Sequence, residues 1–273
     1  MKVKTSIAIT LILICLPILY FFIGNERSTD ELVYEYDMEW VEEFNLSRVD
    51  TSKWSFMARR ESDAGRYFSK SSEVFEIRRN FLRLYARKND GIVRDDTASV
   101  LTVGFETFRK QTIDYGKVEV CARIRGAQGA WPAIWLRGED ERYSTYPDYA
   151  EIDIMEHLNY EKKVYQTVHT NYTDILKYRK HPEYSVEVSV DPSKYNVYAV
   201  EILPDRIIFS VNGRKTLTYP KIETNEYGQF PFGCPMHLMI DMQYGGEWVG
   251  VSDVSTLPAY MDIDWVKFYK LRK

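Results

Sequence analysis

The chain has 273 residues, of which 15% are aromatic, and a formal net charge of −4 at pH 7. A net negative charge gives no electrostatic grip on a phosphate backbone, so the composition argues against a protein that binds nucleic acid. Without an N-terminal leader roughly 250 residues are left, which suits one β-rich domain or two small ones, and the many Tyr and Trp residues favour strands over helices.

Residues 1–24 have the pattern of a targeting segment. Lys2 and Lys4 precede an uninterrupted apolar run of about 19 residues, which is the arrangement of an export signal. A run of that length also comes near to spanning a bilayer, so a cleaved signal peptide and a retained membrane anchor both stay open. Cys15 allows lipidation, although the residue before it is larger than usual at such a site. We expect an exported protein, periplasmic, cell-surface or secreted, in which residues 25–37 are a polar tether.

From residue 38 onward, short strands separated by turns dominate the pattern. Alternating apolar and polar residues predict strands at 81–87, 116–125, 184–190, 196–203, 206–211, 236–244 and 260–269. Asn212-Gly213 after the fifth of these is a strong signal for a two-residue hairpin. No stretch outside the leader sustains helical periodicity. The pattern predicts a single domain over 38–273, built as a sandwich or jelly roll with a face open to a long ligand.

The stretch YAEIDIMEHL holds three carboxylates in a strand-like apolar setting. Glu151 and Asp153 share a face of a regular strand, whereas Glu156, five residues after Glu151, falls on the opposite face. One extra residue, a β-bulge near Ile154 and Met155, would return Glu156 to the face of the other two acids. The competing interpretation is a regular strand on which Glu156 faces solvent.

With a bulge, four effective strand steps separate Glu151 from Glu156, or roughly 13 Å between their Cα atoms. Side chains that lean toward each other bring the two carboxyl groups to about 5–6 Å. Retaining glycosidases hold this pair about 5–5.5 Å apart and inverting ones about 6.5–9.5 Å, so the spacing favours retention. The chemistry needs one acid ionised and the other protonated. Asp153, between them, raises the proton affinity of both through its like charge.

Other segments occur together with the acidic strand: YGKVEVCARIRGAQGAWPAIWL at 115–136, YQTVHT at 165–170 and YMDIDWVKFY at 260–269. In this order and spacing they resemble glycoside hydrolase family 16, which contains laminarinases, agarases, carrageenases and endo-β-galactosidases. The resemblance covers most of residues 38–270. It implies an all-β jelly-roll sandwich of two antiparallel sheets with a concave substrate cleft.

The same resemblance implies the catalytic roles. The bulged E-x-D-x-x-E is similar to the laminarinase and galactosidase branch of the family, in which Glu151 would be the nucleophile, Asp153 its partner and Glu156 the acid/base. The reaction needs no cofactor. We therefore expect an endo-acting, retaining β-glycosidase whose partner is an oligosaccharide or polysaccharide.

Four further residues are candidates for substrate binding. Trp131 matches a family position near the −1 sugar, where a Trp ring can lie against the apolar face of a pyranose. Trp135 shares its face on a regular strand, and that face is either cleft or core. His169 is expected on a strand next to the acids, within reach of Glu151 or the sugar. Trp248 resembles a loop residue at the cleft edge. The plain alternatives are core tryptophans, a structural histidine and a packed loop aromatic.

Short segments around the predicted site differ between branches of the family and so bear on the substrate. Tyr149-Ala150 stands where laminarinases often have Gly-Gly, and residues 58–73 lack a pattern common in those enzymes. GAQGAWPA, EIDIMEHLNY and DMQYGGEWVG are most similar to gut-bacterial members that act on mucin O-glycans, which are endo-β-1,4-galactosidases cutting poly-N-acetyllactosamine. An endo-β-1,3-glucanase and a non-catalytic carbohydrate-binding jelly roll are the alternatives.

The sequence gives weaker signals for a metal site or a disulfide than for the acidic strand. Glu43 and Asp264 match family positions for a structural calcium ion, and oxygen ligands suit calcium; ordinary surface acids are the alternative. No His/Cys cluster indicates zinc. Outside the leader the cysteines are Cys121 and Cys234, each among apolar residues, which favours two buried thiols over a disulfide.

Overall fold

The computed structural model describes residues 34–78, 80–139, 148 and 150–272. The predicted leader and most of the predicted tether fall within 1–33 and so lie outside the described residues. The first strand, β1, spans Tyr36–Glu42, so the last two residues expected in the tether belong to a strand instead. From Tyr34 onward the described residues form one compact unit.

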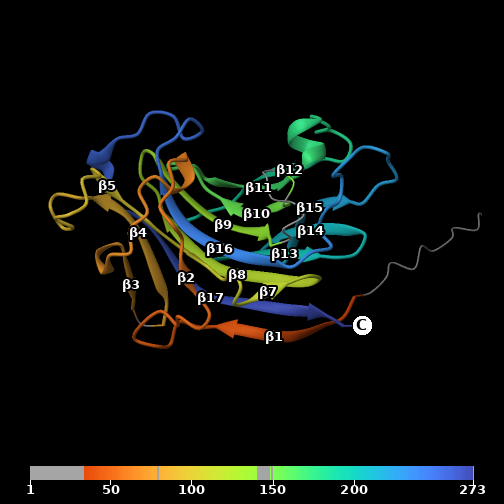
Figure 1. Cartoon of the computed structure of the whole chain (residues 1–273), viewed down its shortest axis with the longest axis horizontal. Helices are drawn as coiled ribbons and strands as arrows, with labels where there is room; N and C mark the ends of the chain where they lie inside the picture. Colours follow the sequence, from red (N-terminus) through yellow and green to blue (C-terminus); the bar gives the residue numbers. More distant parts are fainter. Residues whose placement is uncertain (1–33, 79, 140–147, 149, 273) are drawn as a thin grey trace, which may run out of the picture. The chain divides into compact units, whose positions relative to one another are not determined.

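Two antiparallel sheets form the layers of the fold (Figure 1). The first sheet has the order β15-β14-β13-β8-β17-β4-β3, with β1 paired to β17 and β5 paired to β4. Besides β1, its strands are β3 (Phe75–Ile77), β4 (Leu82–Lys88), β5 (Val100–Leu101), β8 (Gly116–Arg125), β13 (Asn196–Ile202), β14 (Arg206–Val211), β15 (Arg214–Pro220) and β17 (Ala259–Leu271).

The second sheet has the order β12-β11-β10-β9-β16-β6-β2, with β7 paired to β16. Its strands are β2 (Ser55–Phe56), β6 (Val103–Glu106), β7 (Thr112–Ile113), β9 (Ala130–Gly138), β10 (Glu151–Glu156), β11 (Lys163–His169), β12 (Ser185–Ser189) and β16 (Met236–Tyr244). This architecture confirms the predicted fold class. It also places the acidic strand β10 in the middle of a sheet, where both of its edges are paired.

The strands predicted from alternation are all present, with ends within two residues of the expected ones. The predicted hairpin joins β14 to β15, and both of its turn residues have positive φ, 52° at Asn212 and 75° at Gly213. Helical structure in the described residues is confined to short turns: η1 (Asp63–Gly65), η2 (Ser72–Val74), η3 (Asn171–Ile175) and η4 (Val254–Thr256). Where the structure describes the chain, it contains no helix long and apolar enough to cross a membrane.

The main core lies between the sheets and is built by the alternation of their strands. Val118, Val120 and Ile124 of β8 point into it from the first sheet, and Ile152 and Ile154 of β10 from the second. Because alternate residues of a strand face opposite ways, the polar residues of β10 are left for the outer face of the second sheet. The buried thiols predicted at Cys121 and Cys234 are confirmed.

A stretch that we call the cover segment, residues 57–70, lies against part of that outer face. Its Met57 and Phe68 form a second, small apolar cluster with Ala133, Trp135 and Met239.

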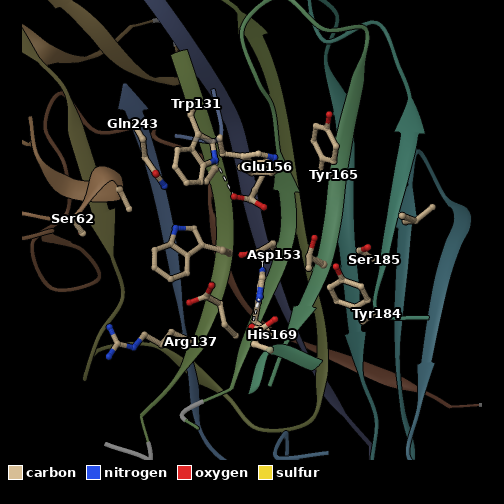
Figure 2. A pocket seen from close by; sticks show the side chains of 18 of the residues that line it. Ser62, Trp131, Arg137, Asp153, Glu156, Tyr165, His169, Tyr184, Ser185 and Gln243 are labelled. Atoms are coloured by element: carbon tan, nitrogen blue, oxygen red, sulfur yellow. Dashed lines mark hydrogen bonds and ion pairs between the residues drawn. The ribbon is translucent and has the colours of Figure 1, made fainter. Parts of the chain in front are cut away.

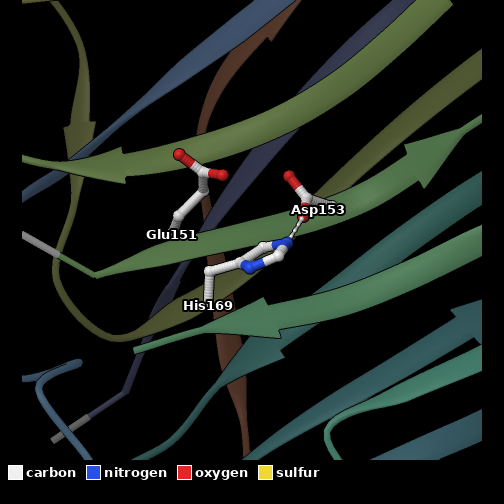
Figure 3. Close-up of side chains that lie close together, drawn as sticks. All are labelled: Glu151, Asp153 and His169. Atoms are coloured by element: carbon white, nitrogen blue, oxygen red, sulfur yellow. Dashed lines mark ion pairs between the residues drawn. The ribbon is translucent and has the colours of Figure 1, made fainter. Parts of the chain in front are cut away.

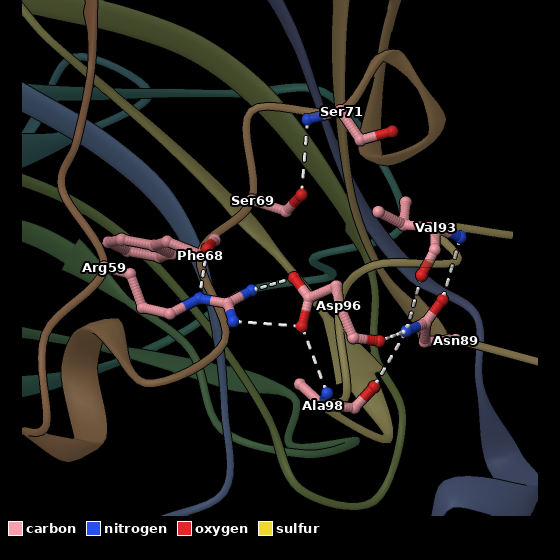
Figure 4. Close-up of polar contacts among 8 residues, drawn as sticks. All are labelled: Arg59, Phe68, Ser69, Ser71, Asn89, Val93, Asp96 and Ala98. Carbon is pink, nitrogen blue, oxygen red and sulfur yellow. Dashed lines mark hydrogen bonds and ion pairs between the residues drawn. The ribbon is translucent and has the colours of Figure 1, made fainter. Parts of the chain in front are cut away.

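Polar contacts hold the cover segment in place (Figure 4). Arg59 donates to the Phe68 carbonyl and makes two hydrogen bonds to the Asp96 carboxylate, of 3.0 and 2.5 Å. Asn89 in turn donates to the carbonyls of Asp96 and Ala98. A two-pronged Arg–carboxylate pair fixes orientation as well as distance, so the segment closes one side of the outer face in a defined position.

Candidate active site

The acidic strand contains the predicted β-bulge. Where β10 pairs with β9, Asp153 lies opposite Trp135 and Met155 opposite Ile134, so Ile154 is the additional residue. The pairing of β10 with β11 shifts at the same place. Ile154 and Met155 are consecutive, yet both are fully buried in the core. The prediction of a bulge is confirmed, and the regular strand is excluded.

As a result the three acids share a cleft. A hollow with a volume of about 630 Å³ lies on the outer face of the second sheet, and Glu151, Asp153 and Glu156 all line it. Figure 2 shows Asp153 and Glu156 in this hollow, with Trp131 and His169 near them. Side chains of β9, β10, β11, β12 and β16 form its floor and walls, together with residues 60–64 on one side and Trp248. Five adjacent strands span roughly 19 Å from the first to the last, which is enough for a chain of several sugar rings.

The residue before the first acid is conformationally strained. Ala150 is fully buried and has a φ of 54°. This left-handed region costs a residue with a Cβ about 1–2 kcal/mol and is entered freely by glycine. The Ala150 carbonyl accepts a hydrogen bond of 3.1 Å from the Gly138 N–H, which helps to hold the turn. Ala150 thus keeps a glycine-like entry into β10 although the sequence departs from Gly-Gly here.

His169 lies on β11 directly opposite Glu151, as predicted for a strand next to the acids. One carboxylate oxygen each of Glu151 and Asp153 and one imidazole nitrogen of His169 all lie within 4.8 Å of one another (Figure 3). The His169 Nε2 is 3.0 Å from Asp153 Oδ2, and its Nδ1 is 2.7 Å from Asp174 Oδ2. The imidazole is therefore clamped between two carboxylates. Asp174, in η3, was not predicted, because nothing in the sequence pattern shows that a turn of η3 folds back onto the ring.

The acids of the cleft have shifted proton affinities. Burial, then the like charge of Asp153, raises the pKa of Glu151 to about 8, while His169 and Arg137 oppose that rise with positive charge. Burial and Asp153 also raise the pKa of Glu156 well above its usual range. Both shifts favour the protonated form of the acid, and a general acid needs a carboxyl group that holds its proton in this way.

The charge of His169 follows from its neighbours. Burial on its own lowers the pKa of an imidazole, but the charge of Asp153 and the hydrogen bonds to Asp153 and Asp174 raise the pKa of His169 well above its usual value. A second cation, Arg137, lies opposite Glu151 on β9, whereas small Ala133 lies opposite Glu156. His169 acts on both glutamates, but Arg137 adds positive charge at Glu151, which favours the ionised form of that glutamate over that of Glu156.

The predicted aromatic residues all line the cleft. The Trp131 indole N–H donates a 2.9 Å hydrogen bond to Glu156 Oε1, so this ring fixes the third acid. Trp248 is 45% exposed and stands edge-on to Trp131 at 5.3 Å and to Tyr165 at 5.1 Å between ring centroids. Trp135 is only 9% exposed, so it belongs both to the cleft wall and to the small apolar cluster.

Sequence reasoning missed several residues that line the cleft. Tyr165 and Thr167 alternate with His169 on β11, and Gln243 lies opposite Trp131 on β16. Period-two spacing from a recognised site residue was the available signal for the β11 pair. Gln243 needed the pairing of β16 with β9, which a single sequence does not reveal.

The two residues suggested for calcium lie far from this cleft in the fold. Glu43 is exposed and follows the end of β1, where Glu42 pairs with Val266 of β17. Asp264 is the extra residue at a bulge of β17, two positions before Val266. The pairing therefore brings both acids to the same end of one strand pair, which is compatible with a shared ion. Two carboxylates supply only part of the six to eight oxygens that calcium takes.

Comparisons with known proteins also identify relatives that act on glycans. The model of the family described as Glycosyl hydrolases family 16 matches residues 35–267. A keratan-sulfate endo-1,4-β-galactosidase of Sphingobacterium multivorum is 30% identical over 247 residues, which cover 90% of this chain and 58% of that protein. A β-glucanase of Rhodothermus marinus is 28% identical over 291 aligned positions, which cover 99% of this chain and 97% of that protein. The chain thus spans less than two thirds of the first relative and nearly all of the second.

A solved structure from work described as "Prominent members of the human gut microbiota express endo-acting O-glycanases to initiate mucin breakdown" is also similar. It superposes with a TM-score of 0.72 at 26% identity and covers 86% of this chain and all of its own. The fold, the acidic cleft and the sequence similarity therefore all indicate a glycoside hydrolase.

Proposed function

Because this chain belongs to glycoside hydrolase family 16, we propose that it is an endo-acting, retaining β-glycosidase. The observation that carries the proposal is the bulge at Ile154, which brings Glu156 into the same cleft as Glu151 and Asp153. A double displacement needs one carboxylate as nucleophile and a second carboxyl group as acid and base. Glu151, which lies beside cations, suits the first role, and Glu156, which accepts a hydrogen bond from the Trp131 indole, suits the second.

In the first step a Glu151 carboxylate oxygen attacks the anomeric carbon while the bond to the leaving oxygen breaks. Glu156 donates its proton to that oxygen, and a glycosyl ester of Glu151 forms. In the second step Glu156 removes a proton from water, the water oxygen attacks the anomeric carbon, and Glu151 leaves as a carboxylate. Asp153 and His169 lie beside Glu151, and the charge of His169 together with the positive charge that develops on the sugar favours the ionised form of Glu151.

The substrate we propose is a β-1,4-galactosyl linkage in poly-N-acetyllactosamine of mucin-type O-glycans. Support comes from the similarity to the keratan-sulfate endo-1,4-β-galactosidase and to the O-glycanase structure. The second candidate is an endo-β-1,3-glucanase, which the nearly full-length match to a β-glucanase favours. Digesting mucin O-glycans and laminarin side by side decides between them, because cleavage of laminarin alone contradicts the first choice. A non-catalytic carbohydrate-binding protein would cleave neither.

Replacing His169 with Gln should shift the acid limb of the kcat/KM profile to higher pH, by about one unit or more. The positive charge of His169 lowers the pKa of Glu151, so its loss raises that pKa, and the nucleophile then ionises only at higher pH. The measurement is kcat/KM from pH 4 to 9. Exposed His181 is the matched control, since its replacement by Gln should leave the profile in place. An unshifted or lowered acid limb in the His169 variant would contradict the assignment.

We also propose that calcium binds near Glu43 and Asp264. An ion that binds only the folded state stabilises it by mass action. The melting temperature should therefore rise when calcium is added to chelator-treated protein, and the rise should shrink in a variant with Asp264 replaced by Asn. A melting temperature that does not respond to calcium would remove this proposal.

We also propose that residues 1–24 direct export of the protein, with or without a membrane tether.

A further inference from the structure

Asp241 is a buried carboxyl group behind the wall of the cleft, and the proposed chemistry does not use it. It lies on β16, on the same face as Gln243, and is completely buried. Its Oδ2 accepts a 2.8 Å hydrogen bond from the Trp135 indole N–H. Its Oδ1 has no hydrogen-bond partner among the described residues. A carboxyl group with one oxygen left without a partner is costly to bury, which marks Asp241 as a candidate for a role beyond packing.

The surroundings of Asp241 are unusually small. Its neighbours across the sheet are Gly104 on β6 and Ala133 on β9, and Ala133 in turn lies opposite Glu156. A Cβ added to Gly104 would come within 2.9 Å of the Asp241 Cβ and within 2.5 Å of the Met57 sulfur. The carboxyl group is therefore enclosed by the cover segment above and by small residues at its sides, and the Trp135 ring separates it from the open cleft.

Charged groups reach Asp241 from several elements. Burial raises its pKa to about 7; among charges, Arg60 of the cover segment opposes the rise and Asp153 of β10 adds to it. The Gln243 amide also favours the ionised form. Glu106 of β6 lies opposite Met239, one alternate position along the same face of β16.

Three more titratable groups lie on this face. His237 is four residues before Asp241 on β16, where burial lowers its pKa to about 4, so it is neutral around pH 7. Glu156 is on the far side of Ala133, and Glu139 lies near His237, 3.4 Å from its Nδ1. Within the described part of the chain, the hydrogen bond to the Asp241 carboxyl comes from Trp135 and from none of these three groups.

We propose that Asp241 is a positioning residue: its carboxylate holds the Trp135 indole in the cleft wall opposite Asp153, and its ionisation sets how firmly that ring is held. The inference rests on the proposed function in one respect, since it takes Trp135 to contact the glycan. A hydrogen bond to an ionised acceptor is roughly twice as strong as one to a neutral acceptor. Trp135 is thus held more firmly above neutral pH than below it.

The indole N–H resonances of the full ¹⁵N-labelled chain test the inference without any substrate. Six tryptophans give six candidate signals, and the Trp135 signal is the one lost in a Trp135→Phe variant. We expect this signal to move with pH with a midpoint near 7, and to stop moving in Asp241→Asn, whose amide oxygen still accepts the hydrogen bond but does not ionise. The signal of core residue Trp54 is the internal control. A Trp135 signal that is static in the wild type, or that titrates unchanged in Asp241→Asn, overturns the proposal.

Kinetics supply the second arm. Asp241→Leu, which cannot accept the bond, should raise KM for the cleaved glycan about tenfold with a smaller change in kcat, and wild-type KM should fall about fivefold from pH 6 to 8. Asp241→Asn should remove that pH dependence. If the chain cleaves no glycan while the Trp135 signal behaves as expected, the proposed function fails and the role of Asp241 stands. If cleavage is normal and KM ignores both Asp241 variants, the role of Asp241 fails.

Discussion

Replacing Glu151 with Ala should lower kcat/KM by about 10⁴-fold or more, because the carbon under attack loses the group that forms the covalent intermediate. The remaining carboxylates cannot substitute. Asp153 is committed to His169 at 3.0 Å, and Glu156 is held by Trp131 at the other end of the pair. The measurement is the rate on whichever of the two substrates, mucin O-glycans or laminarin, the wild type cleaves.

Small anions give this variant a specific signature. Alanine leaves a space where the Glu151 carboxylate stood, and azide can enter it and attack the same face of the sugar. We expect azide to restore part of the rate and to yield a glycosyl azide of inverted anomeric configuration. Exposed Glu183 is the matched control, because its change to Ala should leave the rate as in the wild type. If the Glu151→Ala variant stays active without azide, Glu151 is not the nucleophile.

Replacing Glu156 with Gln should have a large effect that depends on the leaving group. For the natural glycan we expect a loss of about 10²–10⁴-fold, the usual contribution of general acid–base catalysis. For an aryl glycoside whose leaving group is stable as an anion, the first step needs no proton, so bond cleavage should stay close to the wild-type rate.

The comparison of the two substrates separates the acid from a structural residue. In the Glu156→Gln variant the glycosyl ester should accumulate on the aryl glycoside, since no base activates water, and a burst of released phenol should appear. Equal losses on both substrates would show that Glu156 does not donate the proton. A Trp131→Phe variant is a useful companion, because it removes the indole N–H from Glu156 but keeps the acid.

The long strands could be predicted from the sequence because each repeats the period of two several times, as in β8 and β17. The edge strands β2, β5 and β7 have two residues each, and β3 has three, which is too short for any period to show. Their pairing is imposed by the neighbouring strands. The η3 turn could not be predicted either, because its position beside β11 depends on contacts between residues of the folded chain, such as that of Asp174 with His169.

The shared cleft of the three acids was predictable because the irregular spacing of Glu156 is itself visible in the sequence. The environment of Trp135 was not. Its strand spacing left cleft and core equally open, and it belongs to both because Met57 and Phe68 of the cover segment lie against the same face. Asp241 was missed for the same reason, since only the fold shows that β16 carries a carboxyl group beside the β9 indole.

A trapped intermediate tests the central claim most directly, namely that Glu151 is the nucleophile of a double displacement. A 2-deoxy-2-fluoro glycoside of the accepted sugar with a good leaving group slows both steps but lets the first proceed, so the glycosyl ester accumulates. We predict that the intact mass of the protein rises by one fluorosugar and that peptide mapping places the ester on Glu151. A label on Glu156 or elsewhere, or no label together with a product of inverted configuration, would contradict it.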